Sequence, residues 1–126
     1  MKVITLLFFI AFLSACGMGG EDRASIEKRH QNADFMTIAT HNGCVRCHRI
    51  KQHVVGPAWQ KVAERYKDSP DARDFLIDKI KRGGAGNWDE VTSGAKMPPH
   101  QGLVTEEHLG KLVDYILALS RKDSEQ

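Results

Sequence analysis

Residues 44–48 read Cys-Val-Arg-Cys-His. This is the C-x-x-C-H pattern through which haem is attached to a polypeptide by two thioether bonds. On one helical turn, positions i, i+3 and i+4 share a face, so both sulfurs can reach the two vinyl groups while the histidine points at the iron. The pentapeptide therefore predicts one covalently bound haem c, attached through Cys44 and Cys47, with His48 as an axial iron ligand.

Two other interpretations of the cysteine pair lack their usual context. A thioredoxin-type dithiol would sit in a βαβ pattern, and no strand pattern is present. A structural zinc site needs a second pair of ligands at a characteristic spacing. The remaining histidines are scattered along the chain, at positions 30, 41, 53, 100 and 108. Haem attachment is therefore the favoured interpretation.

The sixth iron position is predicted for Met97. An iron held by one histidine alone would bind exogenous ligands, so the second axial ligand decides the function. Of the other three methionines, Met1 and Met18 precede the predicted domain, and Met36 falls on a predicted helix, where packing is its expected role. Prolines at 98–99 stiffen the chain and can aim the preceding side chain. A lone methionine commonly fills a core, but a Lys-Met-Pro-Pro loop is an unusual place for that.

Outward from the motif, apolar residues recur at helical spacing in four segments. They predict helices over residues 33–42, 57–66, 70–82 and 106–119, with Thr105 as the N-cap of the last. Residues 83–102 are too rich in Gly and Pro for regular structure, and a loop of that length is usually functional or organised by what it binds. The pattern predicts an all-α fold.

Length and composition are typical of one small soluble domain. The chain has 126 residues, with 18 Lys and Arg against 16 Asp and Glu, so no polybasic surface for nucleic acid is indicated. Only two Trp, two Tyr and five Phe are available to fill a core. A bound haem would supply apolar contact that the side chains lack.

The N-terminus resembles a bacterial lipoprotein signal. Lys2 precedes an apolar run over residues 3–15, which is shorter than the roughly 20 residues needed to cross a membrane. Leu13-Ser14-Ala15-Cys16 resembles a lipobox, so Cys16 is the predicted lipid attachment site. The alternative is a thiol that is removed with an ordinary signal peptide.

These features predict four segments. They are a lipoprotein signal peptide (1–15), a flexible tether (16–32), a haem domain (33–121) and a disordered tail (122–126). The protein is expected to be exported and lipid-anchored on the periplasmic side of a bacterial membrane.

Four motifs occur in the order Cys-Val-Arg-Cys-His (44–48), Gly-Pro-Ala-Trp (56–59), Ile-Lys-Arg-Gly-Gly-Ala-Gly-Asn-Trp (80–88) and Met-Pro-Pro (97–99). Together they resemble the small bacterial class I cytochromes c of the c-551 (c8) type, over residues 34–120. The resemblance implies about four helices wrapped round one haem, with His48 and Met97 ligating from opposite faces.

The resemblance also implies supporting roles. The Pro57 carbonyl would accept from the other ring nitrogen of His48, the Trp88 indole would donate to a haem propionate, and Lys79 would help to neutralise that group. Two features depart from the family pattern. The link over residues 89–96 is longer than usual, and His100 stands where relatives often have Asn.

The expected function is one-electron transfer between respiratory proteins, not catalysis. The predicted donor is a quinol-oxidising complex, and the predicted acceptor is a terminal oxidase, nitrite reductase or peroxidase. A haem sensor with an exchangeable sixth ligand and a fixed subunit of a larger redox complex are the alternatives. Basic side chains near the ligands could form a rim for an acidic partner: Arg46, Arg49, Lys51 and Lys96.

Overall fold

Five α-helices account for most of residues 22–121, the part of the chain that the computed structural model describes. No β-strand occurs in that range, so the all-α prediction is confirmed. The helices are α1 (Arg23–His41), α2 (Trp59–Tyr66), α3 (Ala72–Arg82), α4 (Asp89–Thr92) and α5 (Glu106–Ala118), with 3₁₀ turns η1 (Cys44–Arg46) and η2 (Leu119–Arg121). None of the helices in this part of the chain is both long and apolar enough to span a membrane.

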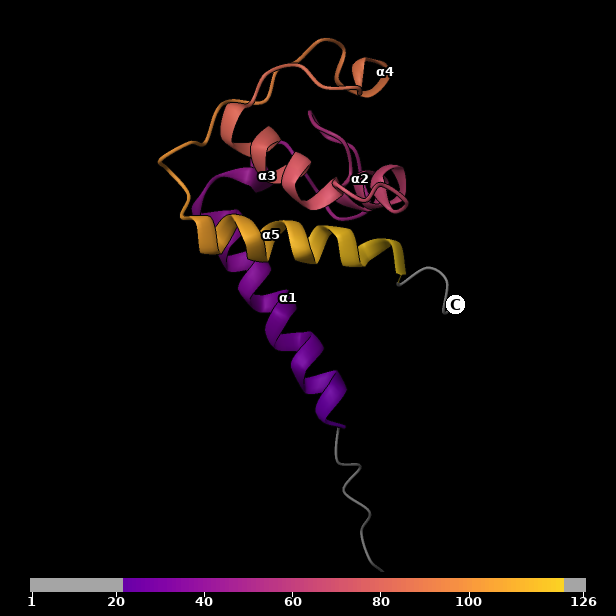
Figure 1. The fold of residues 1–126 in the computed structure, drawn as a ribbon, viewed down its shortest axis with the longest axis vertical. Coiled ribbons are helices and arrows are strands. Elements are labelled where there is room, and N and C mark those ends of the chain that lie inside the picture. Colours follow the sequence, from indigo (N-terminus) through magenta and orange to yellow (C-terminus); the bar gives the residue numbers. More distant parts are fainter. Residues whose placement is uncertain (1–21, 122–126) are drawn as a thin grey trace, which may run out of the picture.

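Helix α5 is the centre of the core. It packs against α1, α2 and α3, and it crosses the upper part of α1 (Figure 1). The predicted N-cap is confirmed, because the Thr105 side chain accepts a hydrogen bond from the His108 backbone N–H. One face of the helix is buried, through Leu109, Leu112, Val113 and Ile116. The apolar stripe read from the sequence is thus the face that meets the other helices.

An aromatic cluster joins three of these helices. Phe35 on α1 is 1% exposed and lies edge-on to Trp59 of α2, with ring centroids 4.8 Å apart. The Phe35 ring also stacks on Tyr115 of α5, with ring centroids 3.9 Å apart. The Tyr115 hydroxyl donates to Asn32 Oδ1 at 2.7 Å, which satisfies the polar end of the ring.

Helix α1 begins ten residues before its predicted start. Asp22 caps it, its Oδ1 accepting from the Ser25 N–H at 2.6 Å. The prediction of a flexible tether is therefore wrong for residues 23–32, which are helical and, apart from partly covered Ser25, exposed. They project beyond the body of the molecule (Figure 1). The predicted signal peptide, Cys16 and the predicted tail (122–126) lie outside the described residues.

Helix α4 was not predicted. The stretch between α3 and Met97 was expected to be irregular, but Val91 and Thr92 both donate their N–H to the Trp88 carbonyl at 2.8 Å. The turn ends at Ser93 and Gly94, which both adopt positive φ. The longer link therefore begins with one helical turn, directly after Trp88.

Candidate functional site

The two cysteines lie on the tight turn that follows α1. Gly43 adopts a φ of 73°, which lets the chain leave α1 and enter η1 at once. The Cys47 and His48 backbone N–H groups both donate to the Cys44 carbonyl. Both thiols are free, and burial raises the pKa of Cys44, with the neighbouring Cys47 adding to the shift. The two sulfurs, which form no disulfide, therefore lie within one turn of each other.

His48 is held with a defined tautomer. Its Nδ1 lies 2.8 Å from the Pro57 carbonyl oxygen, as the resemblance implied. A carbonyl only accepts, so the proton is on Nδ1 and the lone pair is on Nε2. Burial lowers the pKa of His48, although the bond to Pro57 opposes that shift. The imidazole is therefore neutral and presents Nε2 as a metal ligand.

The segment that carries Pro57 folds back closely on His48. The Gly56 N–H donates to the Cys47 carbonyl at 2.8 Å, and a Cβ on Gly56 would lie 2.5 Å from His48 Cε1. Only glycine fits there. Trp59 stacks nearly parallel to the imidazole, 5.7 Å away. The sequence reasoning did not assign Trp59 a role, although its place in the Gly-Pro-Ala-Trp motif was a signal.

Met97 is fixed on the opposite wall by the residues that end α3. The Gly84 N–H donates to the Met97 carbonyl at 2.7 Å, and the Met97 N–H donates back to the Gly84 carbonyl at 3.1 Å. Gly83 adopts a φ of 63°, and a Cβ there would lie 2.4 Å from the Met97 carbonyl oxygen. This close approach sets the path of the chain that carries the predicted sulfur ligand.

Lys79 and Trp88 lie beside that wall. The Lys79 ammonium donates to three carbonyls at the end of α3, those of Gly83 at 2.9 Å, Gly84 at 3.0 Å and Ala85. Because an ammonium has three donors, Lys79 can act on a propionate through its charge but has no spare hydrogen bond. Trp88 packs near Gly86, and its role toward a propionate stays a prediction.

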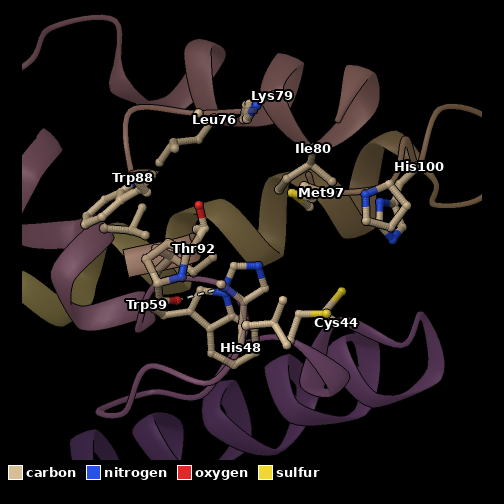
Figure 2. Close-up of a pocket in the computed structure, with 18 of the residues that line it drawn as sticks. Cys44, His48, Trp59, Leu76, Lys79, Ile80, Trp88, Thr92, Met97 and His100 are labelled. Atoms are coloured by element: carbon tan, nitrogen blue, oxygen red, sulfur yellow. Dashed lines mark hydrogen bonds between the residues drawn. The ribbon is translucent and has the colours of Figure 1, made fainter. Parts of the chain in front are cut away.

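All the predicted haem-site residues line a single pocket: Cys44, Cys47, His48, Pro57, Lys79, Trp88 and Met97. His48 and Met97 occupy opposite walls, and Cys44 lies on the His48 side (Figure 2). Apolar side chains such as Leu76, Ile80 and Leu112 complete the lining. Two thiols, a neutral imidazole and a thioether around an apolar pocket fit a covalently attached haem.

The same pocket receives residues that the sequence analysis did not place at the haem itself. Thr92 of α4, Lys96 and His100 all line it. Nδ1 of His100 is buried and has no hydrogen-bond partner among the described residues. No cluster of three or more His, Cys, Asp and Glu side chains suited to a metal ion occurs in residues 22–121.

Comparisons with known proteins agree with this site. Residues 36–120 match the Cytochrome c family. Cytochrome c-552 of Hydrogenobacter thermophilus is 40% identical over 82 residues, which cover 65% of this chain and 78% of that protein. Cytochrome c-552 of Nitrosomonas europaea is 38% identical over 82 residues, covering 65% and 75%.

A solved structure extends the likeness to the fold. The crystal structure of wild-type Nitrosomonas europaea cytochrome c552 superposes with a TM-score of 0.59 at 36% identity, over 68% of this chain and 99% of that one. The family match over residues 36–120 spans every residue that lines the pocket, including the Cys-Val-Arg-Cys-His turn. The chain therefore belongs to the class I cytochrome c family, whose members carry electrons on a covalently bound haem.

Proposed function

We propose that the protein is a lipid-anchored, exported one-electron carrier whose iron is held by His48 and Met97. One observation carries the proposal: the neutral imidazole and the thioether line one apolar pocket from opposite walls. Each is fixed through its own wall, His48 by the Pro57 carbonyl and Met97 by the paired hydrogen bonds with Gly84.

Two protein ligands leave no coordination position for a substrate. Haem, when bound, supplies the exchange of one electron between ferric and ferrous iron. The thioether of Met97 favours the ferrous state and so raises the reduction potential. The closely packed backbone at Gly56 and Gly83 restrains the His48 ring and the Met97 backbone.

Spectroscopy of the purified holoprotein tests the ligand pair. The ferric form should show the weak long-wavelength charge-transfer band of iron bound to a thioether, and the ferrous form should stay low-spin. A sensor with an exchangeable sixth ligand would instead bind carbon monoxide rapidly and stoichiometrically at neutral pH. That result would overturn the carrier proposal.

The partners of the chain are redox proteins, and we propose acidic ones docking on the rim of Arg46, Arg49, Lys51 and Lys96. All four side chains are exposed, and Lys96 also lines the pocket. Val54 and Val55 are 44% and 45% exposed, and Val55 borders the pocket. Positive charge around a small apolar patch suits the weak, brief encounters of electron transfer. A quinol-oxidising complex as donor and a terminal oxidase, nitrite reductase or peroxidase as acceptor fit this chemistry.

Exchange kinetics test the rim. Lys96→Ala should slow electron transfer to an acidic partner and weaken its dependence on ionic strength. Lys67→Ala is the matched control, because Lys67 is also exposed but does not line the pocket. Equal rates and equal salt dependence in the two variants would exclude the rim.

The anchor at Cys16 is supported by the lipobox-like sequence. Several acyl chains on one N-terminus exceed what stable membrane anchoring needs. Cys16→Ser should therefore release the protein from membranes or leave it unprocessed, with haem still attached. Membrane retention of fully processed Cys16→Ser protein would exclude the anchor.

A further inference from the structure

A single side chain from α2 reaches the longer link that precedes Met97. The guanidinium carbon of Arg65 lies 3.7 Å from the centroid of the Trp88 ring. Its Nη1 donates to the Asn87 carbonyl, and its Nη2 donates to Glu90 Oε1 at 3.1 Å. One group therefore contacts Asn87 and Trp88, which precede α4, and Glu90 in the first turn of α4.

These contacts depend on the shape of the guanidinium. A flat, delocalised cation can stack on an indole while its N–H groups donate in the plane, and an ammonium cannot do both. The ion pair between Arg65 and Glu90 contributes little to the strength of this contact, because the Arg65 side chain is 37% exposed and that of Glu90 is 62% exposed. The planar set of N–H donors, and not the charge, therefore accounts for the simultaneous contacts with Asn87, Trp88 and Glu90.

Trp88 is the point through which the contact acts on the pocket. The first turn of α4 is held by the Trp88 carbonyl, which accepts hydrogen bonds from the Val91 and Thr92 backbone N–H groups at 2.8 Å. Trp88 and Thr92 both line the pocket, as do Ala95 and Lys96 farther along the link. Arg65 itself does not line it. A side chain outside the pocket thus holds one of its walls.

We propose that Arg65 is a positioning residue of the haem pocket. It holds the Trp88 ring and α4 in place along one wall, limits the entry of water there, and thereby sets the reduction potential. This inference rests on the proposed function, because it takes the pocket of His48 and Met97 as the haem site.

Two substitutions separate shape from charge. Arg65→Lys keeps the charge but loses the stacked fork, and Arg65→Ala loses both. Arg73→Lys is the matched control: Arg73 forms a two-contact pair with Asp114 that joins α3 to α5, away from the link, and its side chain is 50% exposed. Glu90→Gln removes the ion pair while leaving the ring and backbone contacts of Arg65.

The measurements are the reduction potential of the holoprotein and hydrogen exchange of the Trp88 indole N–H in the ferrous form. Arg65→Lys and Arg65→Ala should both speed that exchange several-fold and lower the potential, because water stabilises the more highly charged ferric state. Glu90→Gln should change both values little. Arg73→Lys should leave both at the wild-type value.

Three results would overturn the inference. In the first, Arg65→Lys matches wild type in both measurements, which would mean that only the charge matters. In the second, the Trp88 indole N–H exchanges faster in the Arg65 variants but the reduction potential does not change. In the third, Arg73→Lys reproduces the effect. The long-wavelength band of the wild-type protein is an independent check: its absence would defeat the proposed ligand pair, whereas wild-type behaviour of Arg65→Lys with the band present would defeat only the role of Arg65.

Discussion

The two walls of the pocket are built in different ways. On the His48 wall, the cysteine turn, the imidazole and its acceptor Pro57 lie within residues 44–57, and their hydrogen bonds join near neighbours. On the Met97 wall, the backbone pairs with Gly84, and the link is held by Arg65, which lies more than twenty residues before it. One wall is local in sequence and the other is tertiary.

This difference indicates where the protein can be tuned. The local wall also carries the covalent attachment, so a change there affects whether haem is held at all. The tertiary wall positions only the second ligand and the nearby indole, so changes there should alter the potential of a protein that still folds. The contrast predicts the largest effects at the attachment site and the smallest at residues outside both walls.

Loss of the thioether bonds should have the largest effect. Cys44→Ala, Cys47→Ala protein should be largely unfolded, because the domain has few large side chains and gains stability from the haem that its native state binds. Helical circular dichroism would be compared with that of the holoprotein. A cooperative melt that matches the holoprotein would show that the side-chain core suffices.

Met97→Ala should leave a folded haem protein with a lower potential. Axial ligands set the potential over a range of roughly 0.8 V, and we expect a fall on the order of 0.1 V or more. The vacated position either stays open, giving a high-spin spectrum and fast carbon monoxide binding, or is taken by His100, which lines the same pocket.

A second substitution separates the two Met97→Ala outcomes. Capture by His100 would give a low-spin, lower-potential bis-histidine form, and Met97→Ala, His100→Ala should abolish it. Met97→Ala protein with an unchanged charge-transfer band and potential would show that another residue is the ligand.

Gly83→Ala should have an intermediate effect. Ala at positive φ is disfavoured by about 1 to 2 kcal/mol, and here the Cβ would also meet the Met97 carbonyl. We expect a lower melting temperature and a lower potential. Gly84→Ala is the control, because Gly84 also has a positive φ, of 86°, but its Cβ would meet nothing within 4 Å. Equal potentials in the two variants would contradict the proposed restraint on Met97.

The smallest effect should come from a cap outside both walls. Thr105→Ala should destabilise the protein by about 1 kcal/mol without changing the potential, because Thr105 caps the helix at the centre of the core. Asp22→Ala removes the equivalent cap of α1. Because the first turns of α1 are exposed, this substitution should lower the melting temperature less than Thr105→Ala does. A larger loss for Asp22→Ala would mean that the projecting part of α1 contributes to the fold.

Most of the fold could be predicted because its determinants are short-range. Helices α2, α3 and α5 follow from apolar spacing, and the Thr105 cap follows from its position before that stripe. The start of α1 was missed because residues 23–32 bury almost nothing and carry no apolar stripe. Helix α4 was missed because one turn is too short to show periodicity.

The sequence by itself determined the cofactor, its attachment and the local wall. These depend on residue types at fixed spacing, so Cys44, Cys47 and His48 can be read directly. Only the tertiary structure decided that the Gly84 backbone pairs with Met97 and that Arg65 holds Trp88. Such contacts join residues whose separation in sequence carries no periodic signal, because folding alone brings α2 and α3 beside the link to Met97.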